Sequence, residues 1–480
     1  MLSPIGPVSP AVRPFEPETT GETLDATIEQ QIDTCVINDM RAFSTRGAAV
    51  AVLHNGTTLY EHGYGVKNEV TGGAVGPRTV FRIGSITKQL TTAALLQQVE
   101  AGRLSLDDPV ERWVGRQVSS RVWGGDLTVR QLLNHVSGIP DFAFDLQGRS
   151  DDGALAAWAE ATLPAALWSP PGVFWNYSNP NFVLAGLVAE NAAGVPFRTL
   201  VQTQVFDLAG MTATTFDPQR VDNGGDFAWG HWRNPETGER VIYHPADYTN
   251  AAIAPAGYAF SNAPDLVRWA LLLMDGGGAV LSQASVSEML GSRVGMDYRP
   301  DQQYGLGVFR EEYGGLEVFQ HSGFIPGWGA MLLWVPERRF AVAVLGNGPS
   351  SMAQAAYCVT TRVLGLTSGA PPNRTTDPSK WDGFVGTYRG SDVLGRPFEI
   401  AVSRGGSQLS VRITGLGAPF PVTLPLTQQN PDVFLIDADG DGNADLDLTF
   451  VRSGGGGAQT RWLRNRQFVG ERIGRLRRRL

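Results

Sequence analysis

A serine and a lysine three residues apart are the pair in this chain best suited to chemistry. They occur in Phe81-Arg-Ile-Gly-Ser85-Ile-Thr-Lys88, and the 480 residues include only three lysines. A desolvated lysine can lose its proton and act as a base, whereas an arginine keeps its proton at any relevant pH. The spacing therefore predicts that Lys88 activates Ser85 as a nucleophile without help from a histidine.

The residues that follow Ser85 are typical of a helix. Apolar residues recur at helical spacing from Leu90 to Val99, and Gly102 ends the pattern. Ser85 would then lie at the helix N-terminus, where unpaired backbone amides can donate to a developing oxyanion. The alternative is that Ser85 is only a helix cap and Lys88 a surface charge, since serine is a preferred cap.

A second candidate segment is Trp175-Asn-Tyr177-Ser-Asn179-Pro180, which we expect in a loop just before a helix. A tyrosine near a lysine can share its proton, so Tyr177 is a plausible base for the serine. Asn179 offers an amide two residues away. The alternative is a packed tyrosine in a turn, because Asn, Ser and Pro are common turn formers.

A third segment, Gln320-His321-Ser322-Gly323-Phe324, is expected where a strand ends. Gly323 would let a substrate backbone approach the strand edge, and the amide of Phe324 could be a second oxyanion donor. A histidine at a strand end can equally be a packed or surface residue. We therefore treat His321, Gly323 and Phe324 as substrate-binding candidates.

His135 in Leu132-Leu-Asn-His135-Val-Ser137-Gly138 could complete a Ser-His-Asp triad. The chain contains no G-x-S-x-G elbow, which disfavours an α/β-hydrolase. We expect His135 to be structural.

Composition excludes several classes of function. The net charge is −8, and the sequence lacks zinc-finger spacing, H-E-x-x-H and a phosphate-binding glycine-lysine loop. We therefore expect no nucleic-acid partner, no metal and no cofactor. No run of eighteen apolar residues occurs, so no transmembrane segment is expected. The oligomeric state is left open.

The first residues, Met1 to Pro10, lack the charged and apolar regions of a signal peptide as written. The expected location is periplasmic or secreted if a leader was removed, and cytoplasmic otherwise. Cys35 and Cys358 are the two cysteines of the chain. Two separate buried thiols are the default expectation, and one disulfide closing a long loop is the alternative.

The order of predicted elements indicates how the chain is organised. An amphipathic helix over 24–36 precedes a hairpin with Asn55-Gly56 as its turn, and a mostly helical middle over 104–290 precedes further strands over 316–345. A last helix over 352–364 follows. Strands on both sides of a helical insertion predict one sheet built from both ends of the segment.

Four parts are expected: an extended arm over 1–21, a catalytic domain over 22–366, a linker over 367–380 and a C-terminal domain over 381–480. The C-terminal part shows short strands between 384 and 451, separated by turn residues. This pattern is typical of a small antiparallel barrel or sandwich.

Ser85-Ile-Thr-Lys88, Tyr177-Ser-Asn179 and His321-Ser-Gly323, in that order, resemble the three motifs of the serine β-lactamase and penicillin-binding protein superfamily. The most similar branch contains class C β-lactamases, D-Ala-D-Ala carboxypeptidases, D-aminopeptidases and related esterases. The resemblance covers about residues 22–366. It implies an α+β fold, with an antiparallel sheet flanked by helices and a helical insertion, and the C-terminal barrel resembles a lipocalin-like appendage.

The resemblance also implies roles for the candidate residues. Ser85 would be acylated, Lys88 and Tyr177 would exchange its proton, and Asn179 would hold the substrate amide. The backbone amides of Ser85 and Phe324 would form the oxyanion hole. These roles describe a serine hydrolase acting on an amide or ester, with a small molecule or short peptide as substrate.

One departure from the motifs affects the expected substrate. His321 stands where β-lactamases carry a lysine, which favours a peptidase or esterase, most of all one acting on a D-residue peptide. A carboxylesterase or class C-like β-lactamase is the alternative within enzymes. A catalytically silent binding protein of the same fold is the alternative from another class.

Two charged segments near the C-terminus are not assigned a function, and whether the first of them binds calcium is left open. Asp437 to Asp445 resembles a calcium loop, but Leu448 at its twelfth position cannot supply a carboxylate, so a hairpin turn is favoured over a metal site. The basic residues 472–480 are interpreted as a solvated terminus.

Overall fold

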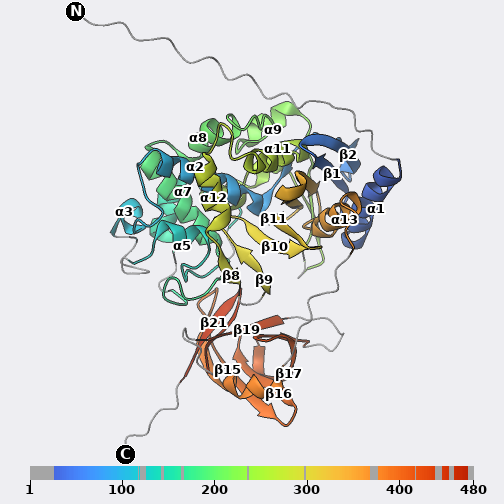
Figure 1. Cartoon of the computed structure of the whole chain (residues 1–480). Coiled ribbons are helices and arrows are strands. Elements are labelled where there is room, and N and C mark those ends of the chain that lie inside the picture. The colour runs from blue at the N-terminus through green and yellow to red at the C-terminus, as the bar shows by residue number, and fades with distance from the viewer. Residues whose placement is uncertain are drawn as a thin grey trace, which may run out of the picture.

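The structure is a computed structural model that describes residues 26–116, 118, 126–141, 145–163, 167–234, 237–296, 299–367, 377–416, 418–437, 446–452 and 459–473. The predicted arm over 1–21, most of the predicted linker and residues 438–445 of the calcium-like loop lie outside these ranges, as do residues 474–480. Figure 1 shows a larger part, built of a sheet and helices, above a smaller barrel.

The larger part is organised around one antiparallel sheet, which in the described ranges has nine strands in the order β3-β2-β1-β13-β12-β11-β10-β9-β8. The N-terminal strand β1 pairs with β13 near the C-terminal end, with Val50 opposite Val344. The predicted sheet built from both ends is therefore confirmed. The strands are β1 (Gly47–His54), β2 (Thr57–Asn68), β3 (Gly72–Ala74), β8 (Val294–Met296), β9 (Arg299–Tyr304), β10 (Phe309–Tyr313), β11 (Leu316–Ile325), β12 (Trp328–Val335) and β13 (Phe340–Gly346).

Strand β1 shows why this sheet is covered on both faces. Apolar side chains alternate in β1, so that Val50 and Val52 belong to one core and Ala49 and Ala51 to the other. The first core lies against α1 (Ala26–Phe43) and α13 (Ala353–Val363), and the second lies against α11 (Ala263–Met274). The small alanines allow α11 to pack closely on the sheet.

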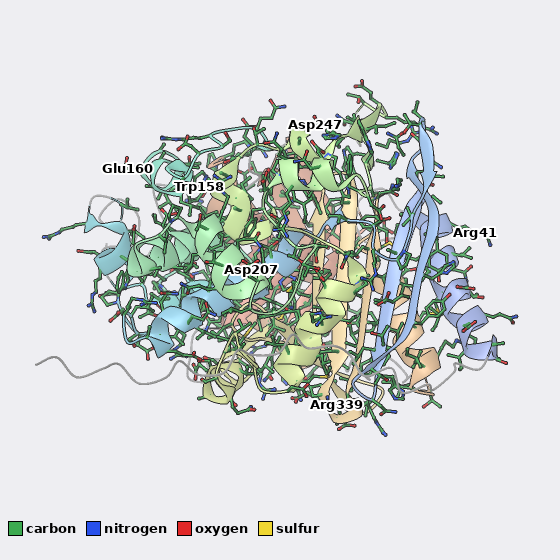
Figure 2. The ribbon with its side chains drawn as sticks, turned by 90° about the horizontal axis from the view of Figure 1, so that it is seen from above. Arg41, Trp158, Glu160, Asp207, Asp247 and Arg339 are labelled. Atoms are coloured by element: carbon green, nitrogen blue, oxygen red, sulfur yellow. A yellow bond between two sulfur atoms is a disulfide. The ribbon has the colours of Figure 1, made fainter. Side chains whose placement is uncertain are left out.

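Cys35 on α1 and Cys358 on α13 form a disulfide, with their Cα atoms 5.6 Å apart. The expectation of two separate thiols is therefore wrong. Both helices pack on the same face of the sheet, which brings together two cysteines that are 323 residues apart in sequence. Figure 2 shows this side of the molecule, marked by Arg41, across the strands from Trp158 and Glu160 in the helical region.

The helical region contains α2 (Thr87–Glu100), which is buried along nearly its whole length. Because α2 is surrounded by protein, even Gln89, Thr91 and Thr92 are buried. It contacts α7 (Asn179–Ala193) and α10 (Ala254–Gly257). The other α-helices in the described residues include α3 (Glu111–Val114), α5 (Val129–Leu133), α6 (Ala154–Ala161), α8 (Phe197–Val201), α9 (Pro218–Gly224) and α12 (Gln283–Gly291).

The C-terminal part is a closed antiparallel barrel, with eight strands in the residues that the structure describes. This confirms the predicted barrel; β20 and β21 were not predicted from the sequence. The strands are β14 (Gly386–Asp392), β15 (Pro397–Gly405), β16 (Gln408–Gly415), β17 (Ala418–Asn430), β18 (Val433–Ile436), β19 (Leu446–Arg452), β20 (Thr460–Asn465) and β21 (Phe468–Arg472). Among the described helices, none combines the length and apolar character needed to cross a membrane.

Candidate active site

Ser85 lies in a short 3-10 turn, Gly84–Ile86, that leads directly into α2. Lys88 is in the first turn of α2, and its Nζ atom is 3.0 Å from Ser85 Oγ. The hydroxyl of Tyr177 donates a hydrogen bond to the same Oγ atom at 2.8 Å. Three residues that the sequence singled out from two distant segments therefore converge on one oxygen atom.

Lys88 is fully buried, and its surroundings suit a neutral amine. Burial lowers the pKa of Lys88 well below its ordinary value, the carboxylate of Asp141 opposes that effect, and Arg466 adds to it. The Nζ atom also lies 2.8 Å from Asn179 Oδ1 and 2.6 Å from the carbonyl oxygen of Ala256. A neutral amine would give its two N–H groups to these oxygens and keep its lone pair for the proton of Ser85.

The Tyr177 segment is held in place by His135. The Nδ1 atom of His135 accepts a hydrogen bond from the Ser178 amide at 3.3 Å. The backbone carbonyl of His135 accepts another from the Asn176 amide at 2.9 Å. His135 is fully buried, and burial lowers its pKa well below the ordinary value. A neutral, backbone-bound imidazole under the loop has the structural role that the sequence suggested.

The edge of β11 runs against the turn that carries Ser85. Gly84 has a φ of +51°, and a Cβ atom built on it would lie 2.4 Å from the amide nitrogen of Phe324. The lack of a side chain at Gly84 therefore allows the Phe324 amide to approach the turn that contains Ser85. This places the two predicted oxyanion donors, Ser85 and Phe324, on neighbouring segments.

His321 lies in the site, but both of its ring nitrogens are engaged by the protein. Its Nδ1 donates to the carbonyl oxygen of Ser322 at 2.6 Å, so its Nε2 accepts from the hydroxyl of Tyr304 at 3.1 Å. Burial lowers the pKa of His321 to about 3. The residue that stands in place of a lysine is therefore neutral and carries no charge for a substrate carboxylate.

These residues open onto a cavity of 710 Å³ that the barrel helps to enclose. The catalytic part lines it with Ser85, Tyr177, Asn179, His321 and Phe324, among others. The barrel contributes Val393, Asp447, Arg464, Arg466 and Gln467. Sequence reasoning brought the first set together and missed the second, because the barrel residues belong to no motif.

Asp141 and Ala256 were also missed by sequence reasoning. Asp141 lies three residues after Gly138, the last residue of the segment that contains His135, and this proximity was the available signal. Ala256 contacts Lys88 through its backbone carbonyl, a group that every residue has, so the residue type could not indicate this contact. The predicted members Ser85, Lys88 and Tyr177 are in mutual contact.

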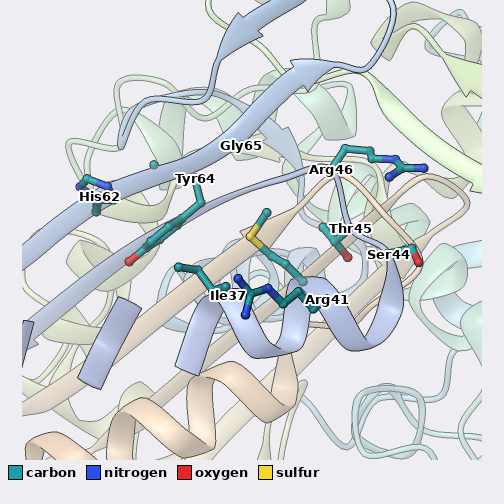
Figure 3. Close-up of a pocket in the computed structure, with 10 residues that line it drawn as sticks. Ile37, Arg41, Ser44, Thr45, Arg46, His62, Tyr64 and Gly65 are labelled. Atoms are coloured by element: carbon teal, nitrogen blue, oxygen red, sulfur yellow. The ribbon is translucent and has the colours of Figure 1, made fainter. Parts of the chain in front are cut away.

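A second pocket of 640 Å³ lies between α1 and β2, as Figure 3 shows. The hydroxyl of Tyr64, which lines this pocket, donates a hydrogen bond to Asp33 at 2.7 Å, and burial raises the pKa of Tyr64. A hydroxyl held in this way stays protonated and is not an activated nucleophile. The lining residues are Ile37, Met40, Arg41, Ser44, Thr45, Arg46, His62, Gly63, Tyr64 and Gly65.

Comparison with protein families decides the classification. The family model described as Beta-lactamase matches residues 32–366, which is most of the chain. The chain belongs to the beta-lactamase family. The resemblance drawn from the three motifs is thereby confirmed, and the match ends before the barrel begins.

One sequence relative and two solved structures that are similar to this chain extend the comparison. Protein flp of Staphylococcus aureus is 27% identical over 323 residues, which cover 66% of this chain and 63% of flp. The structure of SurE is 25% identical with a TM-score of 0.70, covering 93% of this chain and 99% of SurE. A D-stereospecific amidohydrolase from Streptomyces sp. is 27% identical with a TM-score of 0.56, covering 71% and 99% respectively.

Proposed function

We propose that this chain is a serine hydrolase that forms an acyl-enzyme on Ser85 and hydrolyses an amide or ester bond. The observation that carries the proposal is the position of Ser85 Oγ, between Lys88 Nζ at 3.0 Å and the Tyr177 hydroxyl at 2.8 Å. A serine becomes a nucleophile when a neighbouring base can take its proton, and a desolvated lysine is such a base.

This geometry supports the following acylation step. The Oγ atom of Ser85 attacks the carbonyl carbon of the substrate while its proton passes to the neutral amine of Lys88. The negative charge that develops on the carbonyl oxygen is stabilised by the backbone amides of Ser85 and Phe324. When the bond to the leaving group breaks, the proton moves to that group through the Tyr177 hydroxyl, and the acyl group stays on Ser85.

Deacylation uses the same groups in reverse. A water molecule attacks the acyl carbon and gives its proton to Lys88 or Tyr177, and that proton returns to Ser85 Oγ as the ester bond breaks. The amide of Asn179 sits beside Lys88 and is placed to orient the substrate amide. The products are a carboxylic acid and the free enzyme.

We assign a D-amino-acid-type peptide as the substrate class. The support is the similarity to the Streptomyces D-stereospecific amidohydrolase, whose whole length this chain nearly covers. The neutral, buried His321 gives no cation for the carboxylate of a β-lactam, which ranks β-lactamase activity lower. A carboxylesterase would use the same groups.

Covalent labelling tests the proposal directly. A fluorescent fluorophosphonate should label the wild-type chain and fail to label Ser85→Ala. Equal labelling of both would show that Ser85 is not the nucleophile. Hydrolysis of D-Ala peptides, short p-nitrophenyl esters and nitrocefin would then separate the peptidase, esterase and β-lactamase alternatives. Turnover of none of them, with no labelling, would favour a binding protein of the same fold.

A further inference from the structure

The barrel reaches the active site through the side chain of Arg466, which follows β20 in the turn to β21. Its Nε and Nη2 atoms donate to Asp141 Oδ2 at 2.9 and 2.7 Å. The guanidinium group also lies over the ring of Tyr177, 4.6 Å from the ring centroid. The end of the barrel that carries β21 faces the catalytic part of the molecule (Figure 1).

The other carboxylate oxygen of Asp141, Oδ1, binds Asn179, which in turn contacts Lys88. Asp141 Oδ1 accepts hydrogen bonds from the backbone amide and the Nδ2 atom of Asn179, at 2.8 and 3.2 Å. Because Nδ2 is turned to Asp141, the Oδ1 atom of Asn179 faces Lys88. One line of contacts therefore runs from the barrel through Asp141 and Asn179 to the amine of Lys88.

The charges along this line oppose one another. The side chain of Asp141 is only 9% exposed, so its carboxylate is poorly screened by solvent. The carboxylate favours a protonated Lys88, and the guanidinium of Arg466 acts in the opposite sense. Without Arg466, the negative charge of Asp141 would face the lysine uncompensated.

Among the residues that the structure describes, the other titratable groups that face Lys88 do not supply that compensation. His135 and His321 are both buried, and each has a pKa below its ordinary value, so neither is a cation at neutral pH. The Tyr177 hydroxyl is bonded to Ser85. Arg464, the other cation that the barrel brings to the cavity, donates to Asn176 at 2.7 Å.

We propose that Arg466, acting through Asp141, is a positioning residue that keeps Lys88 ready to accept the proton of Ser85. The barrel would then contribute to catalysis through Arg466, in addition to forming one wall of the cavity. This inference rests on the proposed function for its catalytic meaning. Its electrostatic part, the effect of Arg466 on the titration of Lys88, can be measured without substrate turnover.

Loss of Arg466 should leave the barrel in place, because other contacts hold it. Arg464 is buried at the boundary, and Trp462 lies edge-on to Phe174 with ring centroids 5.8 Å apart. Val451 and Val469 complete this apolar contact. An effect of Arg466→Gln on proton transfer can therefore be separated from detachment of the barrel.

The lysine can be observed directly by NMR, because the chain has only Lys67, Lys88 and Lys380. Labelling lysine with ¹³C at Cε gives three side-chain signals, and the Lys88 signal is identified by its loss in Lys88→Met. We expect Arg466→Gln to move the titration of Lys88 up by about one pH unit. Arg466→Lys should restore it, and the change Asp141→Asn added to Arg466→Gln should remove the shift.

The rate of fluorophosphonate labelling gives the catalytic readout. Its acidic limb should move to higher pH in Arg466→Gln by the same amount, because Lys88 must be neutral to accept a proton. The matched control is Arg461→Gln, which removes an arginine paired with Glu471 on the outside of the same barrel. That variant should leave both the titration and the acidic limb unchanged.

Two outcomes would overturn the inference. One is a Lys88 titration in Arg466→Gln that matches the wild type, and the other is an equal shift in Arg461→Gln. A chain that is never labelled, but whose Lys88 shifts as expected, would contradict the proposed function and leave the charge coupling standing. A lowered melting temperature without a shift would assign Arg466 a docking role only.

Discussion

Gly323 on β11 lies directly against Ile83, such that a Cβ atom built on Gly323 would stand 1.9 Å from the Ile83 carbonyl oxygen. That separation is well inside van der Waals contact, and the atom in the way belongs to the backbone. The sheet edge and the segment leading to Ser85 can approach this closely only because residue 323 has no side chain. The position of the neighbouring Phe324 amide depends on this contact.

We predict that Gly323→Ala will slow labelling of Ser85 by about 10²-fold or more, because it pushes the Phe324 amide away from the developing oxyanion. The measurement is the labelling rate, with circular dichroism to verify the fold. Gly295→Ala, in β8 of the same sheet, is the matched control, since a Cβ atom there meets open space. A Gly323→Ala chain labelled at the wild-type rate would remove Phe324 from the oxyanion hole.

The proton acceptor can be tested with the substitution Lys88→Arg. It preserves a positive side chain but replaces a group that can lose its proton with one that cannot. We expect the labelling rate to fall by about 10³-fold. Lys380→Arg, at a lysine whose side chain is 62% exposed, is the control and should label normally. Equal rates for the two variants would rule out Lys88 as the base.

The pH dependence of the wild type follows from the lowered pKa of Lys88. A base must be unprotonated, so activity should rise with pH as Lys88 loses its proton and fall as the pH drops through its pKa. Because burial lowers that pKa, the acidic limb should lie well below the pH at which an exposed lysine titrates, about 10.4. A rate profile that rises only near that value would contradict a neutral Lys88.

The disulfide between Cys35 and Cys358 should contribute to stability rather than to chemistry. It closes a very long loop, and loss of such a bond costs about 2–5 kcal/mol. We expect reduction, or Cys35→Ser with Cys358→Ser, to lower the denaturant midpoint while labelling at low temperature persists. Mass spectrometry that finds two free thiols in the unreduced protein would refute the bond.

Because structural disulfides persist in oxidising compartments, we propose a periplasmic or secreted location for this protein.

Arg82 is a buried cation that donates hydrogen bonds to backbone carbonyl groups, and its removal should destabilise the wall of the cavity. Its guanidinium donates to the carbonyl oxygens of Pro245, Tyr248 and Tyr258, and burial lowers its pKa to about 10. We expect Arg82→Leu to cost about 3 kcal/mol in the free energy of unfolding, since three buried acceptors lose their donor. Chemical denaturation would measure this, with the exposed Arg338→Leu as a near-neutral control.

Local pattern predicted much of the fold and the core of the site. The strands predicted over 316–345 correspond to β11, β12 and β13, and the helix after Ser85 was expected. Ser85 itself lies in a 3-10 turn ahead of α2, which periodicity cannot distinguish from a first helical turn. The order of the three motifs sufficed to bring Ser85, Lys88 and Tyr177 together.

Features that depend on tertiary context were missed. Strand β9 begins Arg299-Pro300 and is polar, so its residue types argued against a strand. Strand β20 places two arginines among its six residues, although Arg464 is buried against the catalytic part. The bond between Asp141 and Arg466 joins residues 325 positions apart, and no spacing rule links them.

The position of β20 and β21 at the end of the described chain has a consequence for synthesis. Ribosomes deliver Ser85, Lys88 and Tyr177 early, and folding proceeds from the N-terminal domain onward. A nascent chain that has just completed residue 366 already contains these three residues, yet its cavity still lacks the side that Arg464 and Arg466 line. Completion of the cavity is thus tied to synthesis and folding of the barrel.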